Sequence, residues 1–372
     1  MQKKKNLIVF GTRPEAIKMA PLVHAFQKEK DFDTRVCITA QHREMLDQVL
    51  DFFNISADYD LDLMKPGQSL YSLTAAIITG MQSVLEEFKP DYVYVHGDTT
   101  TSSIAALAAF YSGAKVCHVE AGLRTHNKWS PFPEEMNRQL TGRLTDLHFA
   151  PTERAKENLL KENTPTNKIF VTGNTVVDAL QHSVETVTKS LSEKAQEIEE
   201  WLEGRELLLV TGHRRENHGD GFDRICEALQ QIAKNNPEIA IVYPVHLNPN
   251  VQKPVNKFLK DISNIKLLEP LAYQDFIWLM HRSKLIITDS GGVQEEAPSL
   301  GKPVLVMRDT TERPEAVEAG TVILVGTNTE KIISETEDLL HNSERYNKMS
   351  ELHNPYGDGK AAQRIVEIIK KH

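Results

Sequence analysis

The stretch Leu285-Ile-Ile-Thr-Asp-Ser-Gly-Gly-Val-Gln-Glu-Glu-Ala-Pro-Ser-Leu-Gly-Lys-Pro-Val-Leu-Val-Met307 indicates the fold of the chain. Its first four residues are apolar or β-branched, as in a buried strand. The glycine-rich turn Ser290-Gly-Gly292 follows, and the residues after it, 293–300, have a helical pattern that ends at a glycine and a proline. A second apolar run closes the stretch. The predicted order is therefore strand, turn, short helix and strand.

Such a turn gathers free backbone N–H groups and the positive end of a helix dipole at one point, which favours an anion such as phosphate. Glycine also lets the backbone approach a ligand closely. The two acidic residues that follow suit the dipole: we interpret Glu295 as a dipole partner only. Glu296 is either a second dipole partner or an acceptor for a ribose hydroxyl. Because Ser-Gly-Gly also occurs in ordinary turns, the motif alone does not define a function.

Size and composition are those of a globular protein with room for two domains. The chain has 372 residues, of which 40% are hydrophobic and 26% charged. Its net charge is −9, and its only basic run is Lys3-Lys-Lys5. We therefore predict no nucleic-acid partner, and an anionic ligand would need local positive charge.

Cysteine usage and hydropathy predict a cytoplasmic protein. Cys37, Cys117 and Cys226 are odd in number and widely spaced, which fits neither a disulfide framework nor a zinc site. We expect them to be reduced core residues. The N-terminal apolar run at residues 7–10 is too short for a signal peptide. No apolar run approaches the ~20 residues of a membrane span, so no membrane partner is predicted.

Short apolar segments alternate with helix-length segments through both halves of the chain, which predicts two doubly wound parallel sheets. A charged segment near 186–205 resembles a connection between domains. We therefore expect an N-terminal Rossmann-like domain at 1–185 and a C-terminal one at 186–359. Because Tyr356-Gly-Asp-Gly359 interrupts the last helical stretch, the helix at 360–372 is expected to pack back on the first domain.

Charged side chains follow several of the predicted strands. Asp98 and Glu120 come just after the strands at 92–95 and 115–119, and Glu134 precedes a helix. Ligands bind at the carboxyl edge of such sheets, where carboxylates bind metal, orient a sugar or transfer protons. No His/Asp pair shows metal-ligand spacing, so we predict no metal.

Two basic side chains and a histidine point to an anionic ligand at the same edges. Arg13 and Lys18 lie in the first helix, near its start, where cations are disfavoured by the dipole. Lys18 could equally be a solvated surface cation. His213 follows the strand at 207–210 and is either a ligand contact or a structural histidine.

Six motifs, in this order, resemble those of the bacterial non-hydrolysing UDP-N-acetylglucosamine 2-epimerases. They are Gly11-Thr-Arg-Pro-Glu-Ala-Ile-Lys18, His96-Gly-Asp-Thr-Thr100, His118-Val-Glu-Ala-Gly-Leu-Arg124, Pro133-Glu-Glu-Met-Asn-Arg138, Gly212-His-Arg-Arg-Glu216 and Asp289-Ser-Gly-Gly-Val-Gln-Glu-Glu296. The resemblance runs from end to end and includes the segments 308–315 and 354–359.

The resemblance implies a glycosyltransferase-B-like architecture of two Rossmann-like domains, the second of them UDP-binding, with the active site in the cleft between them. It implies interconversion of UDP-GlcNAc and UDP-ManNAc through elimination of UDP to give 2-acetamidoglucal, followed by re-addition. The resemblance also implies that neither NAD nor a metal would be required. The product would supply ManNAc-type sugars for cell-surface polysaccharide, and the enzyme would be a homodimer.

The resemblance also implies roles for single residues. The catalytic set would be Asp98, Glu120, Glu134 and His213, with Glu120 and Glu134 as an acid/base pair that we do not assign to the two faces of C2. The substrate-binding set would be Arg13, Lys18, Leu271, Phe276, Ser290, Gly291, Gly292, Glu296 and Arg313. In this set Glu296 holds the ribose, while Leu271 and Phe276 flank the uracil. Relatives carry Gln at position 271, so this base contact departs from the family pattern.

Some members of the family bind a second UDP-GlcNAc as an allosteric activator, next to the segment 41–44. Those members carry Gln at the position of Glu44 in this chain and Arg at the position of Gly67. Allosteric binding of UDP-GlcNAc is therefore an expectation with two departures from the pattern.

Three other functions share parts of this sequence pattern. A glycosyltransferase of the same fold would pass the sugar to an acceptor. A hydrolysing epimerase would release free ManNAc and UDP, and a UDP-sugar sensor would bind without turnover. Incubation with UDP-GlcNAc alone separates these alternatives.

Overall fold

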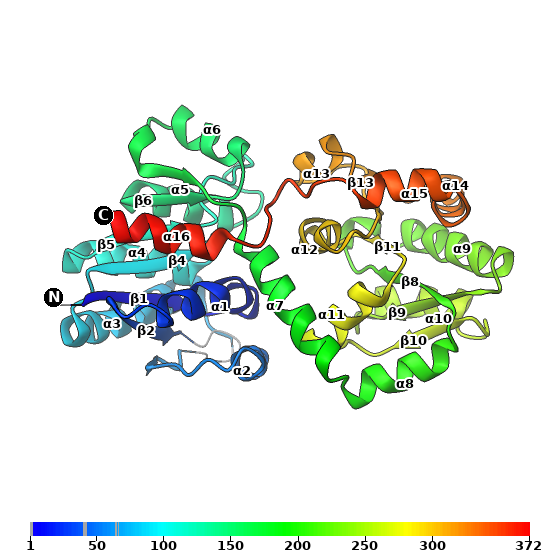
Figure 1. Cartoon of the computed structure of the whole chain (residues 1–372), viewed down its shortest axis with the longest axis horizontal. Coiled ribbons are helices and arrows are strands. Elements are labelled where there is room, and N and C mark those ends of the chain that lie inside the picture. The colour runs from blue at the N-terminus through cyan, green and yellow to red at the C-terminus, as the bar shows by residue number, and fades with distance from the viewer. Residues whose placement is uncertain (1–2, 40–42, 64, 66) are drawn as a thin grey trace. The chain divides into compact units, whose positions relative to one another are not determined.

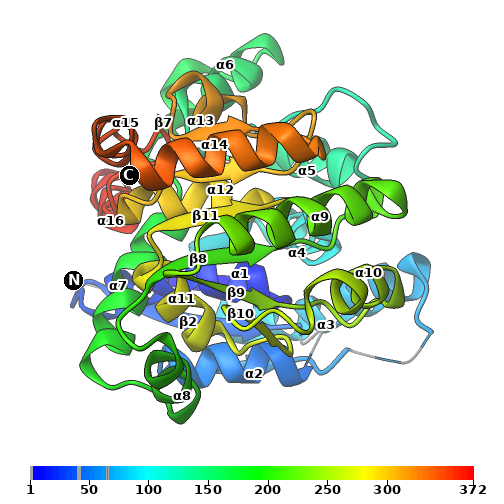
Figure 2. The same cartoon turned by 90° about the vertical axis from the view of Figure 1, so that its right-hand side faces the viewer.

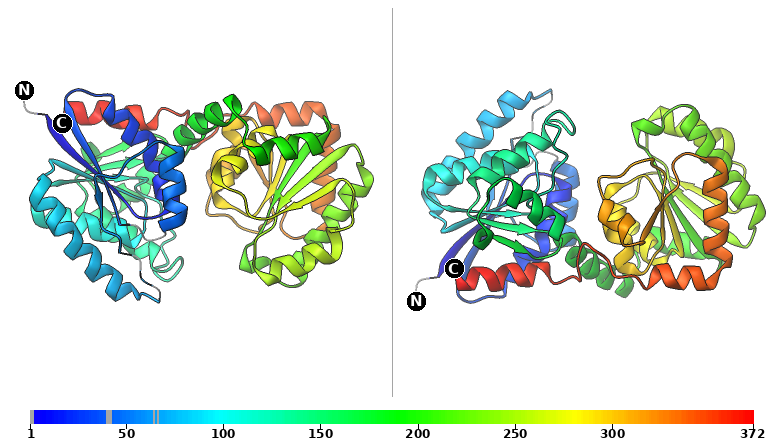
Figure 3. Two further views of the ribbon diagram at one scale, coloured as in Figure 1. Left: turned by 90° about the horizontal axis from the view of Figure 1, so that it is seen from below. Right: turned by 90° about the horizontal axis from the view of Figure 1, so that it is seen from above.

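A computed structural model describes residues 3–39, 43–63, 65 and 67–372. The chain divides into two compact units, one formed by residues 1–179 and 356–372 and the other by residues 180–355. The first division falls inside helix α7 (Thr175–Lys189), and the second at the Pro355–Tyr356 bond. Both units are α/β structures in which helices cover the two faces of a sheet (Figure 1, Figure 3).

The first unit contains a seven-stranded parallel sheet with the order β3-β2-β1-β4-β5-β6-β7. Its strands are β1 (Lys4–Phe10), β2 (Phe32–Ile38), β3 (Tyr59–Asp60), β4 (Tyr92–His96), β5 (Lys115–Val119), β6 (Leu147–Ala150) and β7 (Ile169–Val171). The central strands are buried on both faces, which is why they read as continuous apolar runs.

Helices of the first unit alternate with these strands. They are α1 (Arg13–Gln27), α2 (Arg43–Phe52), α3 (Leu70–Phe88), α4 (Thr100–Ser112), α5 (Glu134–Leu144), α6 (Glu153–Lys161), the 3₁₀ helix η1 (Thr166–Lys168), the start of α7 and α16 (Ala361–Lys371). Helix α4 packs closely on the sheet because its buried face is mostly alanine. Helix α16 contacts α1, and Lys4 Nζ donates to the carbonyl oxygen of Ile369 at 3.1 Å.

The second unit contains a six-stranded parallel sheet with the order β10-β9-β8-β11-β12-β13. Its strands are β8 (Glu206–Thr211), β9 (Ile239–Pro244), β10 (Ile265–Leu268), β11 (Leu285–Thr288), β12 (Val304–Val306) and β13 (Val322–Leu324). This is the strand order of a dinucleotide-binding Rossmann fold. The fold class predicted from the sequence, two Rossmann-like parallel-sheet domains, is therefore confirmed.

Helices of the second unit complete its two faces. They are α8 (Glu193–Leu202), η2 (Arg215–Asn217), α9 (Asp220–Asn235), α10 (Pro249–Leu259), α11 (Tyr273–Arg282), α12 (Gly291–Glu296), η3 (Ala297–Leu300), α13 (Pro314–Glu318), α14 (Thr329–His341) and α15 (Ser343–Ser350). Helices α9 and α14 lie side by side on one face, and α8 contacts α11 (Figure 2).

The stretch 285–307 folds in the predicted order, with one difference in its helix. The helix begins at Gly291 rather than at residue 293, and its second half, η3, is a 3₁₀ helix. Gly301, at φ +65°, ends it. Glycine has a low helix propensity, which hid the first turn from the sequence pattern.

The three cysteines are free and buried, as expected of core residues. Within the described part of the chain, no helix combines the length and the apolarity that crossing a bilayer would need.

Candidate active site

In the first unit, the predicted site residues follow strands at the point where the strand order reverses. This switch lies between β1 and β4, and ligands of doubly wound sheets bind outside the carboxyl ends of the strands there. Arg13 is the first residue of α1, after β1. Asp98 follows β4, and Glu120 follows β5 directly. Among the described residues, the half-buried Arg13 has no ion-pair partner, so its charge is available to an anion.

Glu120 is held in an unusual backbone conformation, with its side chain nearly buried. Its φ is +63°, in the left-handed region that residues other than glycine rarely adopt. Lys18 Nζ forms an ion pair with Glu120 Oε2, and Asn174 Nδ2 donates to the same oxygen at 2.8 Å. His96 Nε2 lies 3.8 Å from it. Strain of this kind is concentrated at functional sites, where the surroundings enforce it.

Asp98 is tied to helix α5. Its carboxylate forms an ion pair with Arg138, and its carbonyl oxygen accepts a hydrogen bond from Asn137 Nδ2 at 3.0 Å. Glu134 is the first residue of the same helix and is half-buried. In the part of the chain that the structure describes, the Glu134 carboxylate forms no hydrogen bond or ion pair. Helix α5 thus carries Glu134 and also holds Asp98 through Asn137 and Arg138.

Glu15 belongs to this edge, although no sequence pattern predicted a role for it. It is 2% exposed and accepts hydrogen bonds from the N–H of Thr12 at 2.9 Å, from Thr99 Oγ1 at 2.7 Å and from Ser102 Oγ at 2.9 Å. Burial raises its pKa, against the lowering effect of these donors. The carboxylate therefore joins the β1–α1 turn, which carries Arg13, to the start of α4. The Thr-x-x-Glu capping box was a possible signal for the cap, but not for the contacts across the sheet edge.

Glu135 is a second residue that the sequence analysis left out. It is fully buried and accepts the N–H groups of Thr125 at 3.0 Å and His126 at 3.1 Å. Burial acts to raise its pKa, but hydrogen bonds from Thr125 and Gln139 and the charge of Arg138 outweigh that effect, so the pKa is lowered. The carboxylate fixes the loop that leads to Glu134.

Three buried histidines lie beneath this edge, on neighbouring strands. His118 on β5 is in register with His148 on β6, and His96 ends β4. Burial lowers the pKa to about 4 for His96 and His118, and to about 3 for His148. They are therefore neutral at pH 7.

In the second unit, the strand order reverses between β8 and β11, and the predicted phosphate residues lie there. Asp289, after β11, is fully buried, and its Oδ2 accepts the backbone N–H groups of His213 and Arg214, both at 2.8 Å. His213, after β8, stacks on His246 with ring centroids 5.2 Å apart. Burial lowers the pKa of His213, and the charge of Asp289 opposes that effect.

The two glycines after Ser290 could each accommodate a Cβ without a close contact. Gly291 and Gly292 are helical, and neither has a positive φ. A Cβ at Gly291 would lie 3.7 Å or more from other protein atoms, and one at Gly292 at least 3.9 Å. Neither conformation nor packing against the protein therefore requires glycine at these positions. Because Gly292 is exposed, a ligand can approach the backbone there.

Glu295 forms a buried ion pair and does not act only as a partner of the helix dipole, as the sequence had suggested. It is 1% exposed, lies beyond the first turn of α12 and forms an ion pair with Arg313. The earlier interpretation is wrong, because Glu295 holds a side chain that was expected to contact substrate. Glu296, half-buried, ends α12 with Oε2 4.0 Å from a Cβ placed on Gly292.

Leu271 and Phe276 lie near the carboxyl end of β10. Leu271 is half-buried in the loop before α11, and Phe276 is half-buried on that helix, whose first turn includes a hydrogen bond from the Phe276 N–H to the Ala272 carbonyl oxygen at 3.1 Å. Of the predicted allosteric segment, Gln41 and His42 lie outside the described residues.

The structure thus groups the predicted residues within each unit. The first unit brings Lys18 to Glu120 and relates Asp98 to Glu134. The second gathers His213, the Ser290–Gly292 turn and Arg313. Among the described residues, no group of three or more His, Cys, Asp or Glu side chains is arranged to hold a metal ion.

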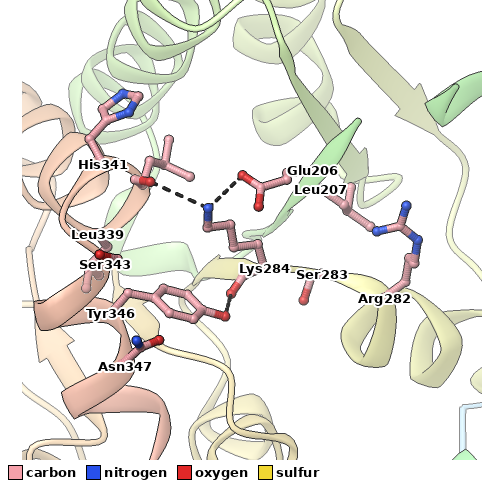
Figure 4. Close-up of a pocket in the computed structure, with 11 residues that line it drawn as sticks. Glu206, Leu207, Arg282, Ser283, Lys284, Leu339, His341, Ser343, Tyr346 and Asn347 are labelled. Carbon is pink, nitrogen blue, oxygen red and sulfur yellow. Dashed lines mark hydrogen bonds and ion pairs between the residues drawn. The ribbon is translucent and has the colours of Figure 1, made fainter. Parts of the chain in front are cut away.

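One cavity of the second unit lies at the opposite edge of the sheet. It has a volume of about 410 Å³ and includes Glu206, Arg282, Lys284 and Tyr346 in its lining (Figure 4). Lys284 Nζ donates to Glu206 Oε2 at 2.6 Å, and Arg282 is paired with Glu199. Because its cations are paired and it adjoins the amino ends of β8 and β11, we assign it no part in the site.

Comparisons with known proteins identify the family. The family model described as UDP-N-acetylglucosamine 2-epimerase matches residues 24–370. A UDP-N-acetylglucosamine 2-epimerase from Yersinia pestis is 59% identical over 371 residues, which cover 99% of each chain. The chain belongs to the UDP-N-acetylglucosamine 2-epimerase family. It is therefore an enzyme of the isomerase class.

Solved structures of UDP-N-acetylglucosamine 2-epimerases agree with this assignment. The crystal structure of the Neisseria meningitidis enzyme bound to UDP-GlcNAc is 53% identical, with a TM-score of 0.86, and the match covers 99% of this chain and 100% of that one. The Methanocaldococcus jannaschii enzyme in complex with UDP-GlcNAc and UDP is 37% identical, with a TM-score of 0.78 and the same coverage.

Proposed function

We propose that this chain interconverts UDP-GlcNAc and UDP-ManNAc without hydrolysis, by eliminating UDP to form 2-acetamidoglucal and adding it back. The observation that carries the proposal is the set of carboxylates at the switch point of the first sheet, with Glu120 buried beside Lys18 and Asp98 linked to the helix of Glu134. The Neisseria meningitidis and Methanocaldococcus jannaschii relatives, described as bound to UDP-GlcNAc, support the choice of substrate.

The chemistry explains why several carboxylates are needed. The C2–H bond of the sugar is weakly acidic, because no neighbouring carbonyl delocalises the charge. Early cleavage of the C1–O bond leaves an oxocarbenium-like centre, which negative side chains stabilise. UDP leaves with the C1–O electron pair as that bond breaks, a carboxylate then takes the C2 proton, and the C2–H electron pair becomes the C1–C2 double bond.

The return step reverses these events on the other face of C2. A protonated side chain delivers a proton to that face, and the diphosphate oxygen attacks C1. Glu120 and Glu134 are proposed as the groups that exchange the proton, and Asp98 as the third carboxylate. Proton transfer by a positioned side chain typically contributes 10² to 10⁴-fold in rate.

The second unit is proposed to retain UDP between the two steps. The exposed Gly292, the adjoining His213 and the cation Arg313 suit a diphosphate. Arg13 is proposed as a further cation for the anionic substrate. Holding both fragments makes the re-addition effectively unimolecular. The product would supply ManNAc-type sugars for cell-surface polysaccharide, and a homodimer is part of the proposal.

Incubation of the purified protein with UDP-GlcNAc alone, followed by product NMR, tests the proposal. We expect UDP-ManNAc to form without an acceptor and to reach an equilibrium with substrate. Stoichiometric release of free ManNAc and UDP would indicate a hydrolysing epimerase instead. Binding without any turnover would contradict the assignment as an epimerase. A panel of UDP-2-acetamido sugars would define substrate range.

A further inference from the structure

Two donors converge on one oxygen of Glu120. Lys18 Nζ and Asn174 Nδ2 both contact Oε2, the latter at 2.8 Å. The other oxygen, Oε1, faces Gly97, where an added Cβ would lie 3.5 Å from it. Two donors on one oxygen restrict rotation of the carboxylate and favour its ionised form. None of the motifs that predicted the site includes Asn174.

Asn174 is itself held by contacts on both sides. It is 2% exposed, and its backbone N–H donates to the carbonyl oxygen of Tyr356 at 2.7 Å. Its side-chain Oδ1 accepts the N–H of Val176 at 3.1 Å, in the first turn of α7. Its amide orientation is therefore fixed, because Oδ1 is used by the helix and Nδ2 is directed at Glu120.

The backbone around Tyr356 packs tightly against the turn that carries Asn174. A Cβ at Gly173 would lie 3.4 Å from Gly357 Cα, and a Cβ at Gly357 would lie 3.4 Å from Gly173 Cα and 3.5 Å from the Asn174 nitrogen. Gly173 has φ +89° and Gly357 has φ +138°. The backbone conformation therefore favours glycine at 357, whereas a Cβ there would make only ordinary van der Waals contacts.

Further hydrogen bonds anchor the same segment to the first unit. Asp178 on α7 accepts the N–H groups of Ala361 at 3.2 Å and Ala362 at 2.9 Å, at the start of α16. Arg364 Nη1 donates to the carbonyl oxygen of Thr172 at 3.0 Å. The segment 356–364 thus clamps the β7–α7 turn from both sides of Asn174.

From these contacts we infer that Asn174 is a positioning residue for Glu120, and that the Tyr356–Gly357 backbone sets its orientation. The inference rests on the proposed role of Glu120 in proton transfer. It gives the segment 354–359, which resembles the family but has no assigned task, a part in the reaction. The segment acts through Asn174 rather than by contacting substrate.

Two substitutions at Asn174 separate positioning from helix capping. Asn174→Asp keeps an oxygen that can accept the Val176 N–H, but it removes the donor and places a like charge against Glu120. Asn174→Ala removes both contacts. Asn328, which caps α14 by accepting the N–H of Lys331 at 2.8 Å, offers a matched capping control in Asn328→Ala. Circular dichroism and thermal unfolding confirm that each variant is folded.

We expect Asn174→Ala to lower kcat on the order of 10- to 100-fold with KM little changed, and Asn174→Asp to lower it at least as much. The acidic limb of the kcat profile should move to higher pH in both variants, further in Asn174→Asp, because the ionised Glu120 loses a donor and then faces a like charge. Asn328→Ala should keep the wild-type kcat. A folded Asn174→Asp with the wild-type kcat and pH profile would overturn the inference.

Gly357→Ala tests the second half of the inference without touching Asn174. A Cβ is strained at the φ of +138°, so the Tyr356–Gly357 backbone should shift, taking with it the carbonyl oxygen that accepts the Asn174 N–H, and kcat should fall with little change in KM. Its effect should be non-additive with Asn174→Ala, because both act through one contact. Full additivity would mean that Tyr356–Gly357 does not act through Asn174.

Glu120→Gln, measured alongside, distinguishes two kinds of failure. If this variant keeps near-normal turnover, the proposed role of Glu120 is wrong, and the positioning role with it. If it loses turnover while both Asn174 variants keep wild-type kcat, only the positioning role is wrong.

Discussion

Oδ1 of Asp289 lies 3.8 Å from Nδ1 of His213, while Oδ2 of the same carboxylate accepts the His213 backbone N–H at 2.8 Å. The carboxylate is fully buried, and Oδ1 has no hydrogen-bond partner among the described residues. A buried carboxylate oxygen without a partner is uncommon and suggests a partner that arrives during function. His213, when protonated, is placed to be that partner.

The first prediction concerns the charge of His213. Burial lowers its pKa and Asp289 raises it, while the neighbouring His246 and Arg214 lower it further. Asp289→Asn removes the only raising effect, so the pKa of His213 should fall. NMR titration, with His213→Gln to assign the signal, measures the change. An unchanged or higher pKa would show that the pair does not interact.

The second prediction concerns the three carboxylates. Asp98→Asn, Glu120→Gln and Glu134→Gln preserve shape while removing charge and proton transfer. Each should lower kcat by about 10² to 10⁴-fold without unfolding the protein. Turnover of UDP-GlcNAc, with circular dichroism as the check of folding, provides the test. Near-normal kcat in all three variants would contradict the proposed mechanism.

The third prediction concerns retention of UDP by the Ser290–Gly292 turn. A Cβ at the exposed Gly292 would lie at least 3.9 Å from the nearest side-chain atoms, so a substitution there should leave the fold intact and intrude on a ligand. Gly292→Val, more than Gly292→Ala, should raise the release of free UDP and 2-acetamidoglucal. Chromatographic analysis of the products measures this ratio. Lower activity without release would indicate that the turn contributes only to initial binding.

The fourth prediction concerns stability at low pH. Three buried histidines stay neutral in the folded protein at pH values where they are protonated in the unfolded chain, that is, below about 6.5. Their pKa values are about 4 for His96 and His118 and about 3 for His148. Their stabilising effect is full above pH 6.5 and falls as the pH drops towards 4, by about 1.4 kcal/mol per pH unit for each histidine. Asp178, whose pKa is raised to about 6, has the opposite effect: its contribution to stability rises as the pH falls below 6 and offsets the loss from one histidine over part of this range.

Hydrogen exchange in strands β4, β5 and β6 measures this effect within the first unit. Protection should decline steeply between pH 6.5 and 4.5, after correction for intrinsic exchange rates. His148→Asn should make the decline shallower. Protection that stays constant over this interval would show that the buried histidines do not govern acid stability.

The strands and the sheet edge could be predicted from the sequence because they depend on local patterns. Residues 285–288 are apolar since β11 is buried on both faces, and carboxylates that follow parallel strands must share an edge. The contacts between distant segments could not be predicted. Arg313 forms its ion pair with Glu295 only because the chain returns to α12 after strand β12. Asn174 and Tyr356, whose backbone groups are hydrogen-bonded, are 182 residues apart in the sequence.

The roles of buried acids were similarly beyond the sequence pattern. Glu15 and Glu135 look like surface or helix-start residues, yet both are buried and bind backbone N–H groups. Their burial depends on which loops the fold places over them, and the local hydrophobic periodicity of the sequence does not predict that burial.

Incubation with UDP-GlcNAc in D₂O, followed by NMR of C2, tests the central claim most directly. Proton removal from C2 and redelivery from solvent-exchangeable groups predict UDP-ManNAc with deuterium at C2, and no accumulation of free ManNAc. UDP-ManNAc that keeps the original proton at C2, or free ManNAc released in step with UDP, would contradict the account.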